Sequence, residues 1–301
     1  MKYLLFIFSF LIHSLCFAQD EETDSSAVRR SSNSKGIQSG LYIGFLFPNK
    51  STASLYDGYG YDIYSVKNDF LNSFMYQKIV IEYGGGNGQT DQIAQSLNVN
   101  PGEWAFDKTD MPINMRYSPS LTVGLQGRWK ASKQTSVILN VNAAKLSANG
   151  NFTIQLLAPP IGPVQPGYQN FKIFSIIGVE QRLWFQAGLQ RIFGKDEVIG
   201  FLLVGGLALN MVKFYRNEII INNLRIDLMT FYNQYGNEIY RAKNLTGVSF
   251  GAFGSVGANI NTASNWTVQF LYTPMYGKVN LIQNQELALQ HTLGLRLYYD
   301  F

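Results

Sequence analysis

The stretch HTLGLRLYYDF, residues 291–301, alternates apolar and mixed positions with a strict period of two. One face carries only apolar or aromatic side chains: Leu293, Leu295, Leu297, Tyr299 and Phe301. Successive side chains of a β-strand point to opposite faces of its sheet. The stretch therefore predicts a strand with one apolar face and one mixed face.

The same alternation recurs upstream and predicts eight strands in all. The predicted strands are residues 39–47, 120–130, 136–146, 171–193, 198–214, 247–261, 266–279 and 288–301. A strand of about 9–11 residues crosses a bilayer. We therefore expect the strand at 171–193 to extend beyond one.

The connections between these strands alternate in length. Tight turns are expected at 131–134, 194–197 and 262–265, and longer loops at 48–118, 148–170, 216–244 and 280–287. Outer-membrane barrels have short periplasmic turns and longer extracellular loops. With an even number of strands, this pattern predicts an outer-membrane location with both termini in the periplasm.

The composition also favours a membrane barrel. Charged residues make up 15% of the chain, against about a quarter in typical soluble domains, and aromatic residues make up 14%. Past the N-terminal segment no run of about 20 apolar residues occurs, so alternating strands could cross lipid only as a sheet without edges. We expect an all-β, antiparallel transmembrane β-barrel with long extracellular loops and eight strands, or ten if FMYQKIVIEY, residues 74–83, adds to the sheet. The net charge of +4 is small and forms no basic stripe, which argues against nucleic-acid binding.

The N-terminus, MKYLLFIFSFLIHSLCFAQ, predicts a secretory signal peptide over residues 1–18. Lys2 precedes an apolar run, and Ala18 fits the small residue of a cleavage site. A lipidated Cys16 is the alternative, but Leu15 before it is not small. Residues 19–36 are polar and rich in Ser and charge, which predicts a flexible periplasmic leader before a barrel domain at 37–301.

Together, the signal MKYLLFIFSFLIHSLCFAQ and the ending LGLRLYYDF make the chain resemble small outer-membrane β-barrel proteins of Gram-negative bacteria, of the kind found in the Bacteroidota. The resemblance implies that the barrel-assembly machinery recognises the last strand as an insertion signal. The implied signal residues are Leu293, Leu295, Leu297, Tyr299 and Phe301. The resemblance names no single activity.

Strand alternation predicts a group of polar side chains inside the barrel: Arg128, Glu180, Arg182, Gln186 and Arg296. An eight-stranded barrel is just wide enough for its own side chains. One interpretation is an ion-pair network that fills the lumen, and the other is a polar path for a small solute. Phe174, Trp184 and Phe253 are also expected to point inward.

No catalytic residue or cofactor site is expected. His291 is the only histidine past the signal peptide and shares a face with Leu293, so it is interpreted as an interfacial residue. One histidine and no cysteine leave no zinc site, so no metal is expected.

Two other stretches could suggest a ligand. The acidic residues Asp57, Asp62 and Asp69 are spread among tyrosines without an EF-hand pattern. The stretch EYGGGNGQT, residues 82–90, lacks the Lys-Ser/Thr of a phosphate-binding loop and is interpreted as a glycine-rich turn.

The first long loop is rich in aromatic residues, which are frequent at binding surfaces: Tyr56, Tyr59, Tyr61, Tyr64, Phe74, Tyr76, Trp104 and Phe106. The loop either folds over the barrel mouth or binds a protein partner.

The leading hypothesis for the function of the chain is a non-enzymatic accessory or anchoring subunit of a larger outer-membrane complex, by analogy one of type 9-like protein secretion. The alternatives are a narrow channel or small-ligand binder and, third, a lipid-modifying enzyme. Expected partners are outer-membrane lipid, the assembly machinery, and other outer-membrane or periplasmic proteins.

Overall fold

The computed structural model describes most of the chain past residue 35. The described residues are 36–62, 64, 66–132, 134–161, 169–194, 198–232, 238–241, 246–262, 265–280 and 287–300. The chain divides into two units, Met1–Ser34 and Lys35–Phe301, and the first lies wholly outside the described residues. The predicted signal peptide, the leader up to residue 35 and Phe301 therefore lie outside them as well. No helix in the described ranges is long and apolar enough to cross a membrane.

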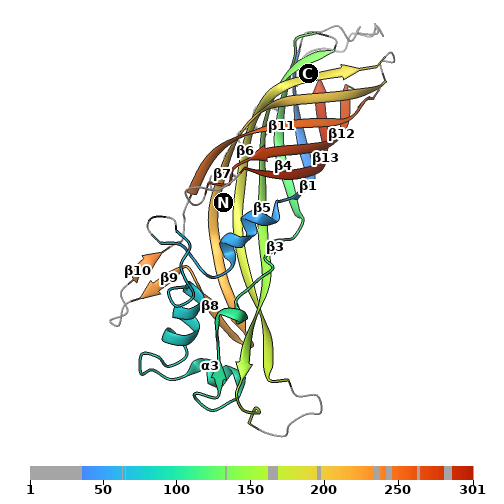
Figure 1. Ribbon diagram of the computed structural model, residues 1–301. Coiled ribbons are helices and arrows are strands. Elements are labelled where there is room, and N and C mark those ends of the chain that lie inside the picture. The colour runs from blue at the N-terminus through green and yellow to red at the C-terminus, as the bar shows by residue number, and fades with distance from the viewer. Residues whose placement is uncertain are drawn as a thin grey trace, which may run out of the picture. The chain divides into compact units, whose positions relative to one another are not determined.

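Eight antiparallel strands pair in a closed ring (Figure 1). They are β1 (Ile37–Phe47), β4 (Ser120–Lys130), β5 (Thr135–Leu156), β6 (Phe171–Phe193), β7 (Ile199–Ile221), β11 (Thr246–Asn261), β12 (Trp266–Gly277) and β13 (Ala288–Asp300). Each pairs with the next in this order, and β13 pairs back with β1, where Gln38 lies opposite Asp300. The predicted eight-stranded antiparallel barrel is confirmed.

Two strands run seven or more residues past their predicted ends. β4 and β6 have the predicted bounds, but β5 runs to Leu156 and β7 to Ile221, rather than to residues 146 and 214. The added parts of β5 and β7 both pair with the first half of β6. A bulge at Val179/Glu180 in the β6–β7 pairing marks where the added part begins.

The polarity of β5 reverses along its length. Near the tight turn, Leu139 faces outward and is 63% exposed, while Asn140 is buried inside. Past Lys145, Asn151 is exposed on the outer face and Ile154 is fully buried on the inner face. Apolar side chains face lipid in a membrane barrel but face the core in a water-soluble sheet. β5 therefore has the pattern of a strand that begins against lipid and continues into water.

Some of the exposed aromatic side chains lie towards both ends of the apolar outer band, as in the aromatic girdles of membrane barrels, while others such as Phe185 and Phe270 lie between them. Those beside the tight turns are Trp129, Phe193, Phe201 and Trp266, and those towards the opposite end are Phe47, Tyr215, Phe250 and Tyr276.

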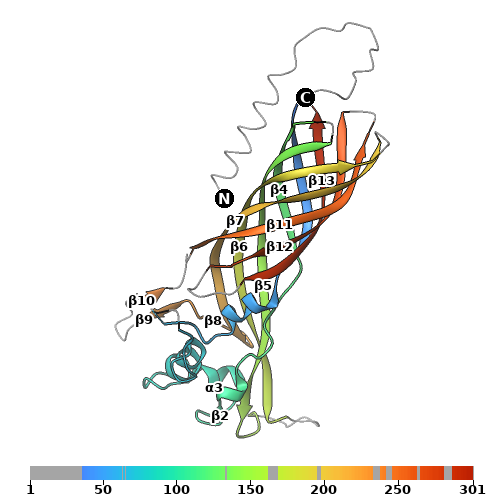
Figure 2. The same ribbon diagram turned by 45° about the horizontal axis from the view of Figure 1, so that its top comes forward.

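The segment between β1 and β4 packs beside the extended ends of β5–β7 (Figures 1 and 2). Its elements are η1 (Lys50–Tyr56), α2 (Phe74–Tyr76), η2 (Gln77–Glu82), α3 (Gln92–Leu97), β2 (Trp104–Ala105), η3 (Lys108–Asp110) and β3 (Arg116–Tyr117). Further along the chain lie β8 (Leu224–Asp227), which pairs with β7, and the hairpin of β9 (Thr230–Tyr232) and β10 (Glu238–Arg241). We call residues 48–119 together with β8 the cap.

A hydrophobic core joins the cap to the extended strands. Tyr56, Met75 and Ile79 of the cap are fully buried with Ile154 of β5 and Ile176 of β6. The loop that was expected at 48–118 is therefore a folded structure with its own core.

The ten-stranded alternative is wrong, because residues 74–82 form α2 and a single π-helical turn, η2. The hydroxyl of Ser73 accepts a hydrogen bond from the Tyr76 amide at 3.1 Å and caps the helix. Met75 and Ile79 are four residues apart, so a helix places both on the face that packs into the core. This burial overrides the strand propensity of the β-branched residues nearby.

Candidate functional site

The five predicted lumen residues all lie inside the barrel. Arg128, Glu180, Arg182, Gln186 and Arg296 are each at most 8% exposed. They do not form one network. Glu180 and Arg182 lie beside the cap, Gln186 accepts a hydrogen bond from the Asn142 amide at 3.1 Å, and Arg128 and Arg296 lie towards the tight turns.

Glu180 is the centre of a buried hydrogen-bond cluster, which we call the hub. Its carboxylate accepts from the Tyr56 hydroxyl at 2.5 Å, the Tyr117 hydroxyl at 3.1 Å and Arg182 Nε. Arg182 Nη1 donates to Gln290 Oε1 at 2.8 Å. Because Tyr56 and Tyr117 belong to the cap while the others lie on β6 and β13, the hub joins the cap to the barrel.

The hub tyrosines remain hydrogen-bond donors at physiological pH. Burial raises the pKa of the Tyr56 hydroxyl well above its ordinary value, and the neighbouring carboxylate of Glu180 raises it further. Burial and Glu180 also raise the pKa of Tyr117. The Glu180 carboxylate is thus surrounded by the Arg182 guanidinium and two hydroxyl donors that stay protonated. This arrangement suits a structural connection between the cap and the barrel.

The aromatic residues predicted to bind a partner mostly build the cap. Tyr56 and Phe106 are buried in its core, and Tyr76 packs edge-on against Phe70 with ring centroids 5.1 Å apart. Four more pack partly buried against the core: Tyr59, Tyr61, Phe74 and Trp104. Tyr64 is 74% exposed. Partner binding by this loop stays a prediction, and Tyr64 is the predicted residue best placed for it.

Two exposed apolar residues that follow Tyr64 within seven positions of the sequence were missed by the sequence reasoning. Val66 and Leu71 have more than half of their surface exposed. They carry no aromatic ring and fit no strand or helix period, so no sequence signal marked them. We call Tyr64, Val66 and Leu71 the apolar trio.

Buried and local polar contacts hold the segment that carries the trio. Lys67 Nζ lies 2.6 Å from Asp57 Oδ2 and 4.3 Å from the centroid of the Tyr59 ring. Burial raises the pKa of the Asp57 carboxyl, and the hydrogen bond from Lys67 opposes that rise. Asp62 Oδ1 accepts from the amides of Tyr64 and Val66 at 2.9 and 2.8 Å.

The other predicted ligand-like stretches have structural partners. Asp69 accepts hydrogen bonds from the amide and the side chain of Asn72. In the described ranges no group of three His, Cys, Asp or Glu side chains could hold a metal ion. The glycine-rich stretch 82–90 forms turns, with Gly85 and Gly88 at φ values of 79° and 75°.

His291 lies on the outer face, in the β13 strand beside β12. Its Nδ1 is 2.6 Å from the Tyr272 hydroxyl, and the two rings stack with centroids 5.7 Å apart. The arrangement is that of an aromatic pair at the edge of a membrane band.

If His291 is interfacial, we expect His291→Ala to leave the lipid composition of the outer membrane unchanged. Mass spectrometry of lipids from cells that express either protein at equal levels checks this. A changed acyl or headgroup profile would support the lipid-modifying alternative instead.

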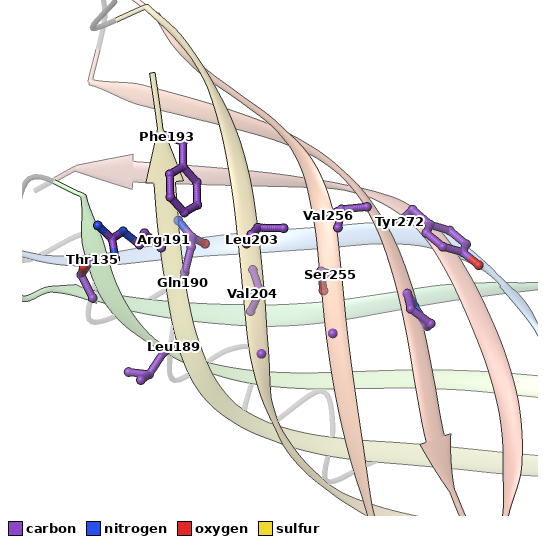
Figure 3. Close-up of a pocket in the computed structure, with 13 residues that line it drawn as sticks. Thr135, Leu189, Gln190, Arg191, Phe193, Leu203, Val204, Ser255, Val256 and Tyr272 are labelled. Carbon is purple, nitrogen blue, oxygen red and sulfur yellow. The ribbon is translucent and has the colours of Figure 1, made fainter. Parts of the chain in front are cut away.

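The outer wall contains a hollow of about 620 Å³ across β6, β7, β11 and β12 (Figure 3). Gly205 and Gly254 lie opposite each other in it, and a Cβ built on Gly205 would meet no atom within 4 Å. Exposed apolar residues line it, including Leu189, Leu203 and Val256. On the apolar outer band, this hollow offers room for hydrocarbon rather than a polar substrate.

Comparison with known proteins gives only distant likenesses. No family model matches the chain, and no curated protein matches its sequence. Among solved structures, Neisserial surface protein A is 7% identical with a TM-score of 0.41, covering 90% of this chain and 100% of that one. The outer membrane protein OprG from Pseudomonas aeruginosa is 10% identical with a TM-score of 0.35, covering 89% and 97%. The attachment invasion locus protein Ail of Yersinia pestis is 11% identical with a TM-score of 0.32, covering 89% and 100%. The barrel assignment rests on the strand pairing of this chain, and we draw no function from these likenesses.

Proposed function

We propose that this chain is a non-enzymatic outer-membrane β-barrel that uses its cap to hold a partner protein, as an accessory or anchoring subunit of a larger complex. The outer-membrane location is supported by the apolar outer band, the polar interior and the tight turns at one end. We infer from the same pattern that the cap lies outside the cell and both termini lie in the periplasm, because outer-membrane barrels have their short turns on the periplasmic side. A role in type 9-like protein secretion rests on the sequence analogy alone.

The observation that carries the proposal is the exposed apolar trio. Its three residues lie within eight positions of one another, on a segment held by the Asp57–Lys67 ion pair and by Asp62. Exposed apolar side chains of a folded surface are available to pack against a protein partner. The contacts of Asp57, Asp62 and Lys67 also reduce the conformational entropy that the described residues beside them lose on binding.

The barrel interior suits an anchor better than a channel. Buried side chains occupy it beside the cap at Glu180 and Arg182, further along at Asn142 and Gln186, and near the tight turns at Arg128. An open conduit would require these groups to move apart. Planar-bilayer conductance of the purified protein is the measurement that would favour the channel alternative.

We expect a gentle detergent pull-down of the tagged full chain from native membranes to yield a stoichiometric partner by mass spectrometry. Combined Tyr64→Ser, Val66→Ser and Leu71→Ser changes should reduce its recovery by roughly 30-fold, as expected when about 2 kcal/mol of interface energy is lost. Ile113→Ser is the matched control, because Ile113 is an exposed apolar cap residue outside the trio. Equal recovery with the triple variant would contradict the proposed surface, and a solitary wild-type barrel would contradict the proposed function.

A further inference from the structure

Two arginines inside the barrel have no acidic partner. Arg128 and Arg296 are each 3% exposed, and in the described ranges neither forms an ion pair. Arg128 Nη1 and both Nε and Nη1 of Arg296 are buried without a hydrogen-bond partner. The carboxylate of Asp300, which acts on Arg128 electrostatically, is itself paired with Lys130 Nζ at 2.8 Å.

The two arginines flank the seam where the first and last strands of the barrel meet. Arg128 is on β4 and Arg296 is on β13, and β1 pairs with both strands. The Arg128 guanidinium lies 4.3 Å from the centroid of the Tyr298 ring, which shares a strand face with Arg296. Gly40 of β1 permits this contact, because a Cβ there would lie 2.7 Å from the ring. Arg296 and Arg128 are also close enough to repel each other electrostatically.

The side chains that accept hydrogen bonds from the two guanidiniums are neutral amides. Gln38 Oε1 accepts from Arg128 Nε. With its amide turned to satisfy its neighbours, Asn140 accepts from Arg296 Nη2 at 3.2 Å and donates to Gln126 Oε1 at 2.7 Å. Amide oxygens satisfy single N–H groups, but they do not neutralise charge.

The charge must therefore be compensated by something else. Elsewhere in the described interior of the barrel, Glu180 is matched by Arg182, so the two arginines at the seam remain as excess positive charge. Arginine does not lose its proton in proteins, so deprotonation cannot remove the cost of burying these two charges. A buried charge without compensation is strongly unfavourable.

We propose that a small inorganic anion of about the size of chloride binds between Arg128 and Arg296. It compensates both charges, accepts from their unpartnered N–H groups, and ties β4 to β13 across β1. The interior of an eight-stranded barrel is filled by its own side chains, so a larger anion does not fit. The anion acts as a structural element that holds the closing seam of the barrel.

The test measures thermal unfolding of the purified full chain in detergent, with chloride replaced stepwise by gluconate at constant ionic strength. We expect chloride to raise the unfolding midpoint of the wild type by roughly 5 °C when its concentration is about 100 times the dissociation constant of the site. Arg296→Met should lose this dependence and, in gluconate, should unfold at a higher temperature than the wild type, because it removes an uncompensated charge. Arg191→Gln is the matched control, because Arg191 is an exposed arginine on β6 and should keep the full chloride response.

A second measurement needs no variant. Crystals of the wild type grown in bromide should show an anomalous scattering peak within hydrogen-bond distance of both guanidiniums. A midpoint that does not depend on chloride, or that depends on it equally in Arg296→Met, would overturn the proposal. So would ordered water without a bromide peak between the two arginines.

Discussion

Glu180→Leu is expected to destabilise the folded protein by about 3–5 kcal/mol, the usual effect of breaking a buried ion pair by removing one partner. The change leaves Arg182 buried without a counter-charge, and it removes the acceptor of the Tyr56 and Tyr117 hydroxyls. Burial is the largest cause of the raised pKa of both hydroxyls and persists in the variant, so it opposes their ionisation in place of Glu180. Equilibrium unfolding in detergent micelles, followed by near-ultraviolet circular dichroism, measures the effect.

The double variant Glu180→Leu with Arg182→Met is the control. It removes both charges, and replacing a buried ion pair by apolar side chains of similar size is often neutral. We expect it to regain most of the stability that the single variant loses, with a remaining deficit of about 1–3 kcal/mol from the unpaired tyrosine hydroxyls. If the double variant loses as much stability as Glu180→Leu and Arg182→Met lose separately when their losses are summed, the hub is not the coupled unit that its geometry indicates.

The period-two pattern was sufficient to predict the ring of strands and the inward direction of all five lumen residues. It could not predict their partners, because Tyr56 reaches Glu180 across 124 positions of sequence. It also could not show that Arg128 and Arg296 lie apart from the hub, because strand parity gives the face of a side chain and not its position along the barrel axis. The register between strands shows that position, and the ion pairs show which arginine has an acidic partner.

The cap was the least predictable part. Its aromatic residues suggested a binding surface, but most of them fill a core that forms only against the extended ends of β5–β7. The sequence pattern did not predict those strand extensions, because in β5 the alternation continues past residue 146 while the apolar side chains move from the outer to the inner face. A search for one apolar face therefore stops at the reversal. The trio was missed for the opposite reason, since isolated exposed apolar residues in a loop have no periodic signal.

The reversal itself predicts how three arginine substitutions on β5 will differ. Leu139→Arg places a charge on the outer apolar band and should destabilise the barrel by about 2–4 kcal/mol. Asn151→Arg places the same charge on the same face twelve positions further along, where the side chain is exposed, and should change stability by no more than about 0.5 kcal/mol. Ile154→Arg buries the charge in the core of the cap and should unfold the cap while the barrel stays intact.

Two readouts on each variant separate these outcomes. Retarded mobility of the unheated protein on a denaturing gel reports the barrel, and limited proteolysis of intact cells reports the cap. We expect Leu139→Arg to change the first readout, Ile154→Arg only the second, and Asn151→Arg neither. If Asn151→Arg disturbed the barrel as Leu139→Arg does, the outer face of β5 would lie in lipid along its whole length. The cap would then sit within the membrane rather than beyond it, and the apolar trio would face hydrocarbon instead of a protein partner.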